Sequence, residues 1–394
     1  MSSIPPTTPK PWSPGLSWPK TALAALPMLL LTALMLLGGR PLPQSTLRLV
    51  PLLIVFVLSN VLFVLMLRTG KTDRFRAILF VTVAVCFVLS FIPNLLEVRG
   101  NIGLTGDDVV QGKTPFCHMV IPMTVIPAAL TRTIIFPGSM LTGFAAIGSM
   151  LVLWLAATLA LGRGFCAWGC FFGGLEDGLS RVRKRPLVKA IGKRWTYLPY
   201  AVLGTVVVVS ALTLTPTYCE WLCPFKSVTE FNALTNSRAV AQAVIFFSLF
   251  AGLVVVGPVV TRKRTQCGLF CPMGAFQGFT NKLNAFEVRI DRERCSDCGQ
   301  CEKVCPTFSI DRESLAKGGT RVSCTKCGKC VDACPKGAAA FHVKGTSPGP
   351  QTRRGRLLFL YPAFLFLTVF GSGMIQDGLY RVLLLVTTGS FIAH

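Results

Sequence analysis

The chain has 394 residues, of which 52% are hydrophobic and only 14% are charged, and its formal net charge at pH 7 is +23. A mean hydropathy of +0.57 is typical of a membrane protein and argues against a soluble globular chain. Lysine and arginine that hold loops on the cytoplasmic side account for such a basic charge, so we expect no nucleic-acid partner.

Apolar runs long enough to cross a hydrocarbon core of about 30 Å predict the membrane-spanning helices. We expect seven or eight of them, the first retained rather than cleaved as a signal peptide, after a cytoplasmic tail at 1–20. The last run is short enough to span, to re-enter or to lie at the membrane surface. The runs are 21–37, 47–67, 76–96, 140–161, 195–214, 239–260, 356–372 and 379–393.

Connections rich in lysine and arginine alternate with poorly basic connections along the chain. By the positive-inside rule, the basic connections and the N-terminus face the cytoplasm. We therefore predict a multi-pass protein of the inner cell membrane, with the poorly basic loops in the periplasm. The basic connections are 68–76, 162–195, 261–264 and 353–356, and the poorly basic ones are 97–139 and 215–238.

Three Cys-x₃-Cys pairs lie at the ends of these runs. Residues four apart share one helix face, so each pair could hold one edge of an iron–sulfur cube or a metal ion. The alternative is that the cysteines are small apolar packing residues, although three such pairs at helix ends are difficult to explain by chance. The pairs are Cys166/Cys170, Cys219/Cys223 and Cys267/Cys271.

Two of the pairs lie at cytoplasmic helix ends in the predicted topology. The four thiolates of Cys166, Cys170, Cys267 and Cys271 could therefore meet around one membrane-embedded iron–sulfur cluster, the third of the chain. Cys86 lies in the middle of a span, where packing is its expected role.

The remaining pair lies on the opposite side of the predicted membrane. Cys219 and Cys223 share that side with Cys117 and His118, so a fourth cluster could form there, with His118 or an unidentified group as its last ligand. Thiol–disulfide chemistry is the alternative, because the periplasm is oxidising.

Residues 285–345 contain two runs with the spacing Cys-x₂-Cys-x₂-Cys-x₃-Cys-Pro, which is that of bacterial two-cluster ferredoxins. Three cysteines of one run and the last cysteine of the other hold each [4Fe–4S] cluster in that arrangement. Zinc pairs and disulfide frameworks fit this spacing poorly. The predicted ligands are Cys295, Cys298, Cys301 and Cys334 for cluster 1, and Cys324, Cys327, Cys330 and Cys305 for cluster 2.

Charged residues near the predicted clusters allow two interpretations. Arg163 could offset cluster charge or simply mark the membrane surface. Lys303, Lys326, Lys329 and Lys336 could form a basic face that attracts an acidic ferredoxin or flavodoxin.

The combination of GR-x-FC-x-W-x-C, C-x₃-CPMGAF and the paired ferredoxin run resembles the polyferredoxin membrane proteins of the NapH type. It is also similar to the C-terminal halves of NosR-type and CcoG-type proteins, over about residues 140–345. The resemblance implies electron passage between the quinone pool or cytoplasm and periplasmic partners, or metal-centre maturation. Phe171 replaces the usual proline, and the additional Cys219/Cys223 pair favours a far-side redox site.

Other redox cofactors are not expected. The chain has three histidines, lacks Cys-x-x-Cys-His and has no Gly-x-Gly-x-x-Gly after a strand, so we predict no haem, no flavin and no nucleotide.

We therefore expect an α-helical integral membrane protein with an inserted cytoplasmic α+β two-cluster [4Fe–4S] ferredoxin domain. It would be an electron-transfer component of an oxidoreductase system, and whether it is itself an enzyme stays open. A cytoplasmic ferredoxin, flavodoxin or enzyme subunit would exchange electrons with a periplasmic or membrane partner, for which quinone is one candidate. The expected parts are 1–20 (tail), 21–284 (transmembrane domain), 285–345 (ferredoxin domain) and 346–394 (C-terminal transmembrane segment).

Two other functions compete with this hypothesis. A maturation or metal-reducing factor for a periplasmic or membrane oxidoreductase would use the same cysteines. A redox sensor agrees less well, because we recognise no output domain after the clusters.

Overall fold

The computed structural model is mostly helical, and among the residues that it describes six helices are long and apolar enough to cross a membrane. These helices confirm the predicted membrane character, while the number of spans stays a prediction. The six are Trp18–Leu37, Thr46–Thr69, Leu151–Trp168, Lys193–Thr213, Ser237–Thr261 and Arg354–Thr388. The structure describes residues 15–38, 42–97, 119, 121–132, 147–189, 191–229, 234, 236–346 and 352–391.

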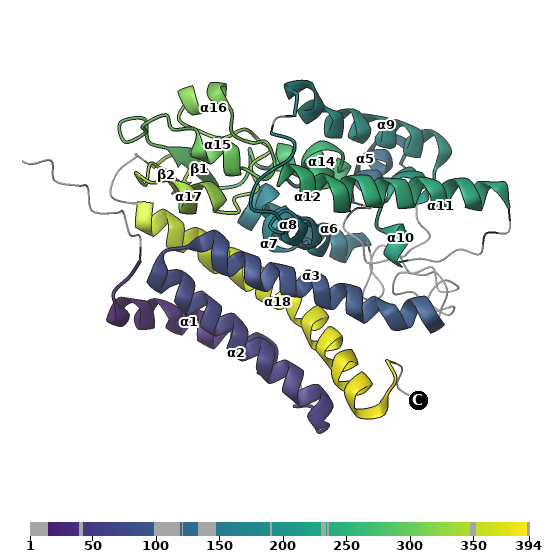
Figure 1. Cartoon of the computed structure of the whole chain (residues 1–394), viewed down its shortest axis with the longest axis horizontal. Coiled ribbons are helices and arrows are strands. Elements are labelled where there is room, and N and C mark those ends of the chain that lie inside the picture. Colours follow the sequence, from purple (N-terminus) through teal and green to yellow (C-terminus); the bar gives the residue numbers. More distant parts are fainter. Residues whose placement is uncertain are drawn as a thin grey trace, which may run out of the picture.

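Four long helices form one bundle (Figure 1). Helix α18 (Thr352–Thr388) packs against α1 (Trp18–Leu37), α2 (Thr46–Thr69) and α3 (Thr72–Glu97). Helix α2 ends at Gly70, whose left-handed backbone (φ 76°) lets the chain reverse directly into α3.

Helix α18 corrects one prediction, because it is a single helix where we expected the separate segments 356–372 and 379–393. Two glycines of α18 allow close packing on α3. A Cβ atom added to Gly371 would lie 2.4 Å from a methyl of Val83, and one added to Gly378 would lie 2.6 Å from the Cβ of Cys86. Small residues commonly permit such helix contacts in membranes. Buried Cys86 is thus a packing residue, as we expected.

The three cysteine pairs lie in three similar helical units. In each unit a long helix leads into a short helical turn with the first cysteine, and another helix starts after the second cysteine. The first unit contains α6 (Ile147–Leu161), η2 (Gly162–Gly164), α7 (Phe165–Trp168) and α8 (Phe171–Leu179). The second contains η3 (Lys193–Tyr197), α9 (Leu198–Thr213), η4 (Tyr218–Leu222) and α10 (Lys226–Thr229). The third contains α11 (Ser237–Leu249), η5 (Phe250–Val256), α12 (Gly257–Thr261), α13 (Thr265–Leu269) and α14 (Pro272–Thr280). Helix α5 (Ile121–Thr131) packs against α9.

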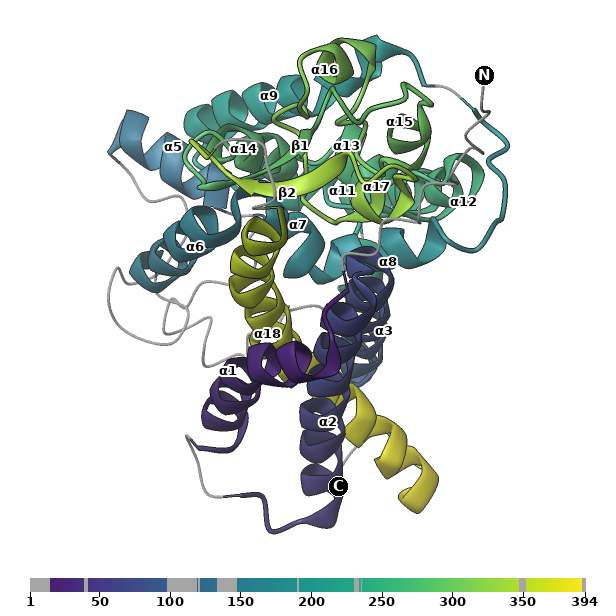
Figure 2. The same cartoon turned by 90° about the vertical axis from the view of Figure 1, so that its left-hand side faces the viewer.

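The ferredoxin region lies at one end of the helices (Figures 1 and 2). Its strands β1 (Phe286–Ile290) and β2 (Ala339–Val343) pair antiparallel. Phe341 of β2 stacks on Phe359 of α18, with ring centroids 4.8 Å apart, so this sheet rests directly on the bundle. The region also contains α15 (Gln300–Val304), α16 (Arg312–Ala316) and α17 (Lys329–Ala333).

The four basic connections all reach the ferredoxin region. This is the grouping that the positive-inside pattern predicts for one membrane side. The contacts are Thr72 N–H to Asp332 (2.9 Å), Lys193 to Glu313 (3.2 Å), Lys263 Nζ to the Cys305 carbonyl (2.8 Å), and Gly355 packed on Phe341.

Candidate iron–sulfur sites

Two cavities in the ferredoxin region are each lined by one predicted set of four cysteines. The outer set consists of Cys295, Cys298, Cys301 and Cys334. The inner set consists of Cys305, Cys324, Cys327 and Cys330. Backbone N–H groups already point at two sulfurs, from Ser309 to Cys305 Sγ and from Ala338 to Cys334 Sγ, both at 3.2 Å. Such donors stabilise thiolate charge, so the cavities suit anionic clusters.

The inner set lies against the membrane domain. Trp168, two residues after Cys166, donates from Nε1 to the carbonyl of Lys326 at 3.1 Å. Arg76 donates from Nε to the carbonyl of Cys327 at 3.2 Å and from Nη1 to the carbonyl of Ala167 at 2.9 Å. One guanidinium therefore joins a ligand loop of the inner set to the first membrane pair.

A second link joins the inner set to the third unit of the membrane domain. The Arg264 N–H donates to the carbonyl of Pro306 at 2.8 Å, and Pro306 directly follows Cys305. Gly268 faces Phe308, whose ring would lie 3.0 Å from an added Cβ atom. The ferredoxin region thus rests on the first and third pairs together.

Cys166, Cys170, Cys267 and Cys271 come together from the first and third units, and that they hold one cluster stays a prediction. All four are buried, and each lies within range of the charge of others in the group. Burial raises the pKa of Cys271 to about 12, so only a bound metal centre would make this thiol a thiolate at neutral pH.

The two pairs share one local backbone geometry. Cys170 (φ −80°, ψ 104°) and Cys271 (φ −66°, ψ 116°) are both extended and both precede a helix. The Cys271 sulfur also accepts the Gly274 N–H at 3.3 Å.

Glu176 fixes the loop of the third unit from the first. Its carboxylate accepts the N–H groups of Gln266 and Cys267 at 2.6 and 3.0 Å. Burial raises the pKa of Glu176 to about 7. For Asp177, burial opposes ionisation, but Arg76 and Arg181 hold its pKa well below the usual range.

Arg264 is a site residue that we did not single out from the sequence. Arg163, for which we left two roles open, is buried inside the protein. Arg264 is 0% exposed, and its Nη1 and Nε atoms have no hydrogen-bond partner among the described residues. A buried cation with free donors fits an anionic group, which four thiolates around a cluster would supply. The signal was present in the sequence as Arg-x₂-Cys-x₃-Cys-x₂-Gly, which occurs at both pairs.

The pair Cys219/Cys223 lies closer to the other two than opposite membrane sides would imply. Tyr218 accepts a hydrogen bond from Gln266 at 2.9 Å, and Phe225 stacks on Phe172 with centroids 3.7 Å apart. Cys223 belongs to the same buried apolar cluster as Cys166, Cys170 and Cys271. The two sites are thus neighbours in one core.

Cys117 and His118, the other predicted ligands of that site, lie outside the described residues. Met119 is described, and its sulfur lies 3.9 Å from the sulfur of Cys271. In the described part of the chain, no three His, Cys, Asp or Glu side chains converge tightly enough for a single metal ion. The cavities lined by four cysteines instead suit a centre larger than one ion.

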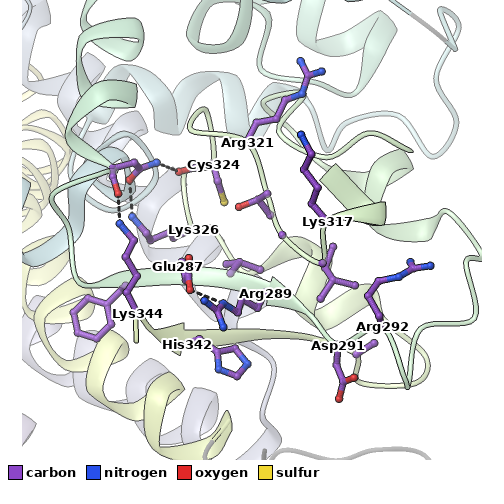
Figure 3. A pocket seen from close by; sticks show the side chains of 18 of the residues that line it. Glu287, Arg289, Asp291, Arg292, Lys317, Arg321, Cys324, Lys326, His342 and Lys344 are labelled. Carbon is purple, nitrogen blue, oxygen red and sulfur yellow. Dashed lines mark hydrogen bonds and ion pairs between the residues drawn. The ribbon is translucent and has the colours of Figure 1, made fainter. Parts of the chain in front are cut away.

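A basic cavity of about 760 Å³ opens on the ferredoxin region (Figure 3). Cys324 of the inner set forms part of its wall. Its charged lining residues are mostly basic: Lys282, Arg289, Arg292, Arg294, Lys317, Arg321, Lys326 and Lys344, against Glu287, Asp291 and Glu293.

The predicted basic face is partly wrong. Lys326 is buried, and its ammonium donates to the carbonyl of Leu161 and to Asn281 Oδ1 at 3.0 and 2.6 Å. Burial lowers its pKa to about 8, so it serves the junction with the membrane domain rather than a partner. Lys303 and Lys336 are exposed, while Lys329 is half-buried.

In a comparison with known protein families, models of iron–sulfur domains match these same segments. Residues 287–335 match a 4Fe-4S dicluster domain. A 4Fe-4S binding domain matches three times, at 142–189, 195–236 and 243–290, so each cysteine pair lies in its own copy. These matches define an iron–sulfur protein with membrane helices.

Curated relatives narrow the class. The chain is 27% identical to "Putative electron transport protein YccM" of Escherichia coli over 40% of its length and 45% of that protein. It is 28% identical to "Methylamine utilization ferredoxin-type protein MauN" of Methylobacillus flagellatus, over 48% and 62% of the two chains. It is also 28% identical to "Ferredoxin-type protein NapH" of Escherichia coli, over 41% and 53%. The chain thus covers about half to two thirds of these relatives, and no solved structure matches it. The resemblance to NapH-type polyferredoxin membrane proteins is confirmed.

Proposed function

We propose that the chain is a membrane-embedded iron–sulfur conduit that passes single electrons between a cytoplasmic donor or acceptor and a redox partner of the membrane or periplasm. [4Fe–4S] clusters at the cysteine sets would supply the one-electron chemistry. Within each cluster site, this chain's residues bind iron, exclude water and adjust the potential.

The observation that carries the proposal is the bridge made by Arg76. Its guanidinium contacts the Cys327 loop and the backbone next to Cys166 at once. Such a rigid junction keeps the inner set and the first pair at a fixed, short separation. Electrons would enter at the ferredoxin pair and move through the inner set to the group Cys166, Cys170, Cys267 and Cys271.

The last proposed step leads to Cys219 and Cys223. Since Tyr218 contacts Gln266, this step is short and needs no jump across the whole core of about 30 Å. Cys117 and His118 are candidates to complete this site. The direction of flow depends on the partner potentials.

We also propose that the ferredoxin region faces the cytoplasm and that the poorly basic loops face the periplasm. The four basic connections gather at the ferredoxin end, which supports this orientation. An acidic electron carrier, such as a ferredoxin or flavodoxin, would dock at the basic cavity, whose wall includes Cys324.

Iron and acid-labile sulfide per chain, measured on anaerobically purified protein, test the conduit. Four cubes predict about 16 iron per chain, and the double variant Cys219→Ser/Cys223→Ser should lose about four. The double variant Cys166→Ser/Cys271→Ser should lose the four iron atoms of another cluster, which its spectrum distinguishes from the first. A wild-type content of about 8 iron, unchanged in both variants, would leave only the ferredoxin clusters and refute the conduit.

The alternative is a maturation factor that delivers or reduces a soft metal. The thioether sulfur of Met119 lies near the sulfur of Cys271, which supports this second candidate because thiolate and thioether ligands select Cu(I). Stoichiometric copper binding that requires Cys271 as well as Cys219 and Cys223, together with about 8 iron, would support it over the conduit.

A further inference from the structure

Two buried arginines join the first and third cysteine pairs reciprocally. Arg163, three residues before Cys166, donates from Nη2 to the carbonyl of Cys267 at 3.1 Å. Arg264, three residues before Cys267, donates from Nη2 to the carbonyl of Cys166 at 2.5 Å. Each unit therefore holds the cysteine loop of the other, in an approximately two-fold arrangement.

Two glycines make room for these guanidinium groups. A Cβ atom added to Gly173 would lie 2.0 Å from Arg264 Nη2 and 2.6 Å from the Cys166 carbonyl. One added to Gly274 would lie 3.0 Å from the Cys267 carbonyl and 3.3 Å from Arg163 Nη2. The glycine of the motif Arg-x₂-Cys-x₃-Cys-x₂-Gly thus leaves a space, here called a socket, for the arginine of the other unit.

Within the described part of the chain, no direct ion pair balances the positive charges of Arg163 and Arg264. Their exposed fractions are 1% and 0%, and in the described part of the chain neither makes a direct ion pair. Nε of both groups and Nη1 of Arg264 lack a hydrogen-bond partner there. Glu176 and Asp177 act on Arg264 only through space. Burying a cation in this state is costly unless an anion lies beside it.

A bound cluster would provide that anion. An oxidised [4Fe–4S] core with four thiolates carries a net charge of about −2, which two guanidinium groups match. Arg264 Nη2 also lies 3.3 Å from the sulfur of Cys267, within range for a charge-assisted hydrogen bond.

We propose that Arg163 and Arg264 are positioning residues that raise the reduction potential of the cluster held by the first and third pairs. One electron from a reduced partner makes that cluster more negative by one charge, and nearby cations favour this reduced state. This inference depends on the proposed third cluster. The pair Cys219/Cys223 has Pro216 and Lys226 at the equivalent positions, so it lacks the same socket.

Redox titration followed by electron paramagnetic resonance tests this role. The signal of the third cluster is identified by its loss in Cys271→Ser. Arg264→Met and Arg163→Met should each lower the midpoint potential of that signal, while Arg264→Lys, which keeps the charge, should stay near the wild-type value. The other cluster signals should not move.

Arg356→Met is the matched control. Arg356 is also buried, but it donates to the Met66 carbonyl and to Thr72 Oγ1, away from the membrane pairs. An unchanged potential in both methionine variants, with the cluster present, would overturn the inference. If the methionine variants lose iron, Arg264→Lys decides: a cluster kept at the wild-type potential supports the role of charge, and a lost cluster overturns it. A wild-type protein without iron beyond the ferredoxin pair would instead refute the proposed function.

Discussion

Replacement of Arg76 by methionine should uncouple the ferredoxin region from the membrane cysteines. Arg76 is fully buried and donates to the carbonyls of Cys327 and Ala167. Its Nη2 pairs with Asp73 at 2.7 Å and with Asp177 at 2.9 Å. Methionine keeps most of the side-chain volume but removes the positive charge and every hydrogen-bond donor. The substitution therefore removes electrostatic interactions without creating a large cavity.

The magnitude follows from what the substitution leaves behind. Removing one partner of a buried ion pair costs about 3–5 kcal/mol. Arg181 still pairs with Asp73 (2.7 Å) and Asp177 (3.1 Å), which places the ion-pair loss at the lower end. Each carbonyl that loses its donor adds about 1 kcal/mol or more. A total of about 5 kcal/mol corresponds to a loss of several thousandfold in the equilibrium between the intact junction and its opened form.

Two measurements report this loss. Limited proteolysis should release the segment 285–345 far faster from Arg76→Met than from the wild type, and chemically reduced ferredoxin clusters should no longer reduce the third cluster rapidly. Arg74→Met is the control, because Arg74 is exposed on the same helix two residues away. Equal proteolysis and equal inter-cluster transfer in both variants would refute the bridge as the junction.

Three further outcomes are expected. Gly173→Ala should lose about four iron per chain because its Cβ atom would clash with Arg264, whereas Gly204→Ala, whose Cβ atom meets nothing within 4 Å, should keep them; equal iron contents would contradict the socket. Asp332→Ala should destabilise the protein by about 1–2 kcal/mol in chemical unfolding, because its carboxylate caps the first turn of α3, and an unchanged midpoint would count against this cap. Lys282→Glu should slow reduction by an acidic carrier several-fold and weaken the salt dependence of the rate, and an unaffected rate would place docking away from the basic cavity.

The sequence predicted what depends on neighbours along the chain. The ferredoxin runs and the three pairs are local patterns, and the basic connections between apolar runs indicated which helix ends lie together. The grouping of Cys166 and Cys170 with Cys267 and Cys271 followed from that pattern alone. Ligand identity remains a prediction until iron is measured.

Contacts between distant segments could not be predicted in this way. The position of Lys326 within a ferredoxin run suggested a surface charge, but the adjacent unit covers it. The separate apolar runs 356–372 and 379–393 suggested two segments, yet they form one helix whose Gly371 and Gly378 contact α3. In each case the local sequence is ambiguous, and the partner that decides the outcome is more than a hundred residues away.

The three copies also explain why one cysteine pair differs from the others. A pair supplies two ligands and a [4Fe–4S] cluster needs four, so copies of this unit must act together. The first and third copies are suited to do so, because each inserts an arginine into the glycine socket of the other. The second copy has neither arginine nor glycine at those positions, so in the proposed conduit its cysteines would need further ligands from another segment. We therefore expect the second copy to differ in chemistry from the first and third copies, which together would hold the proposed third cluster.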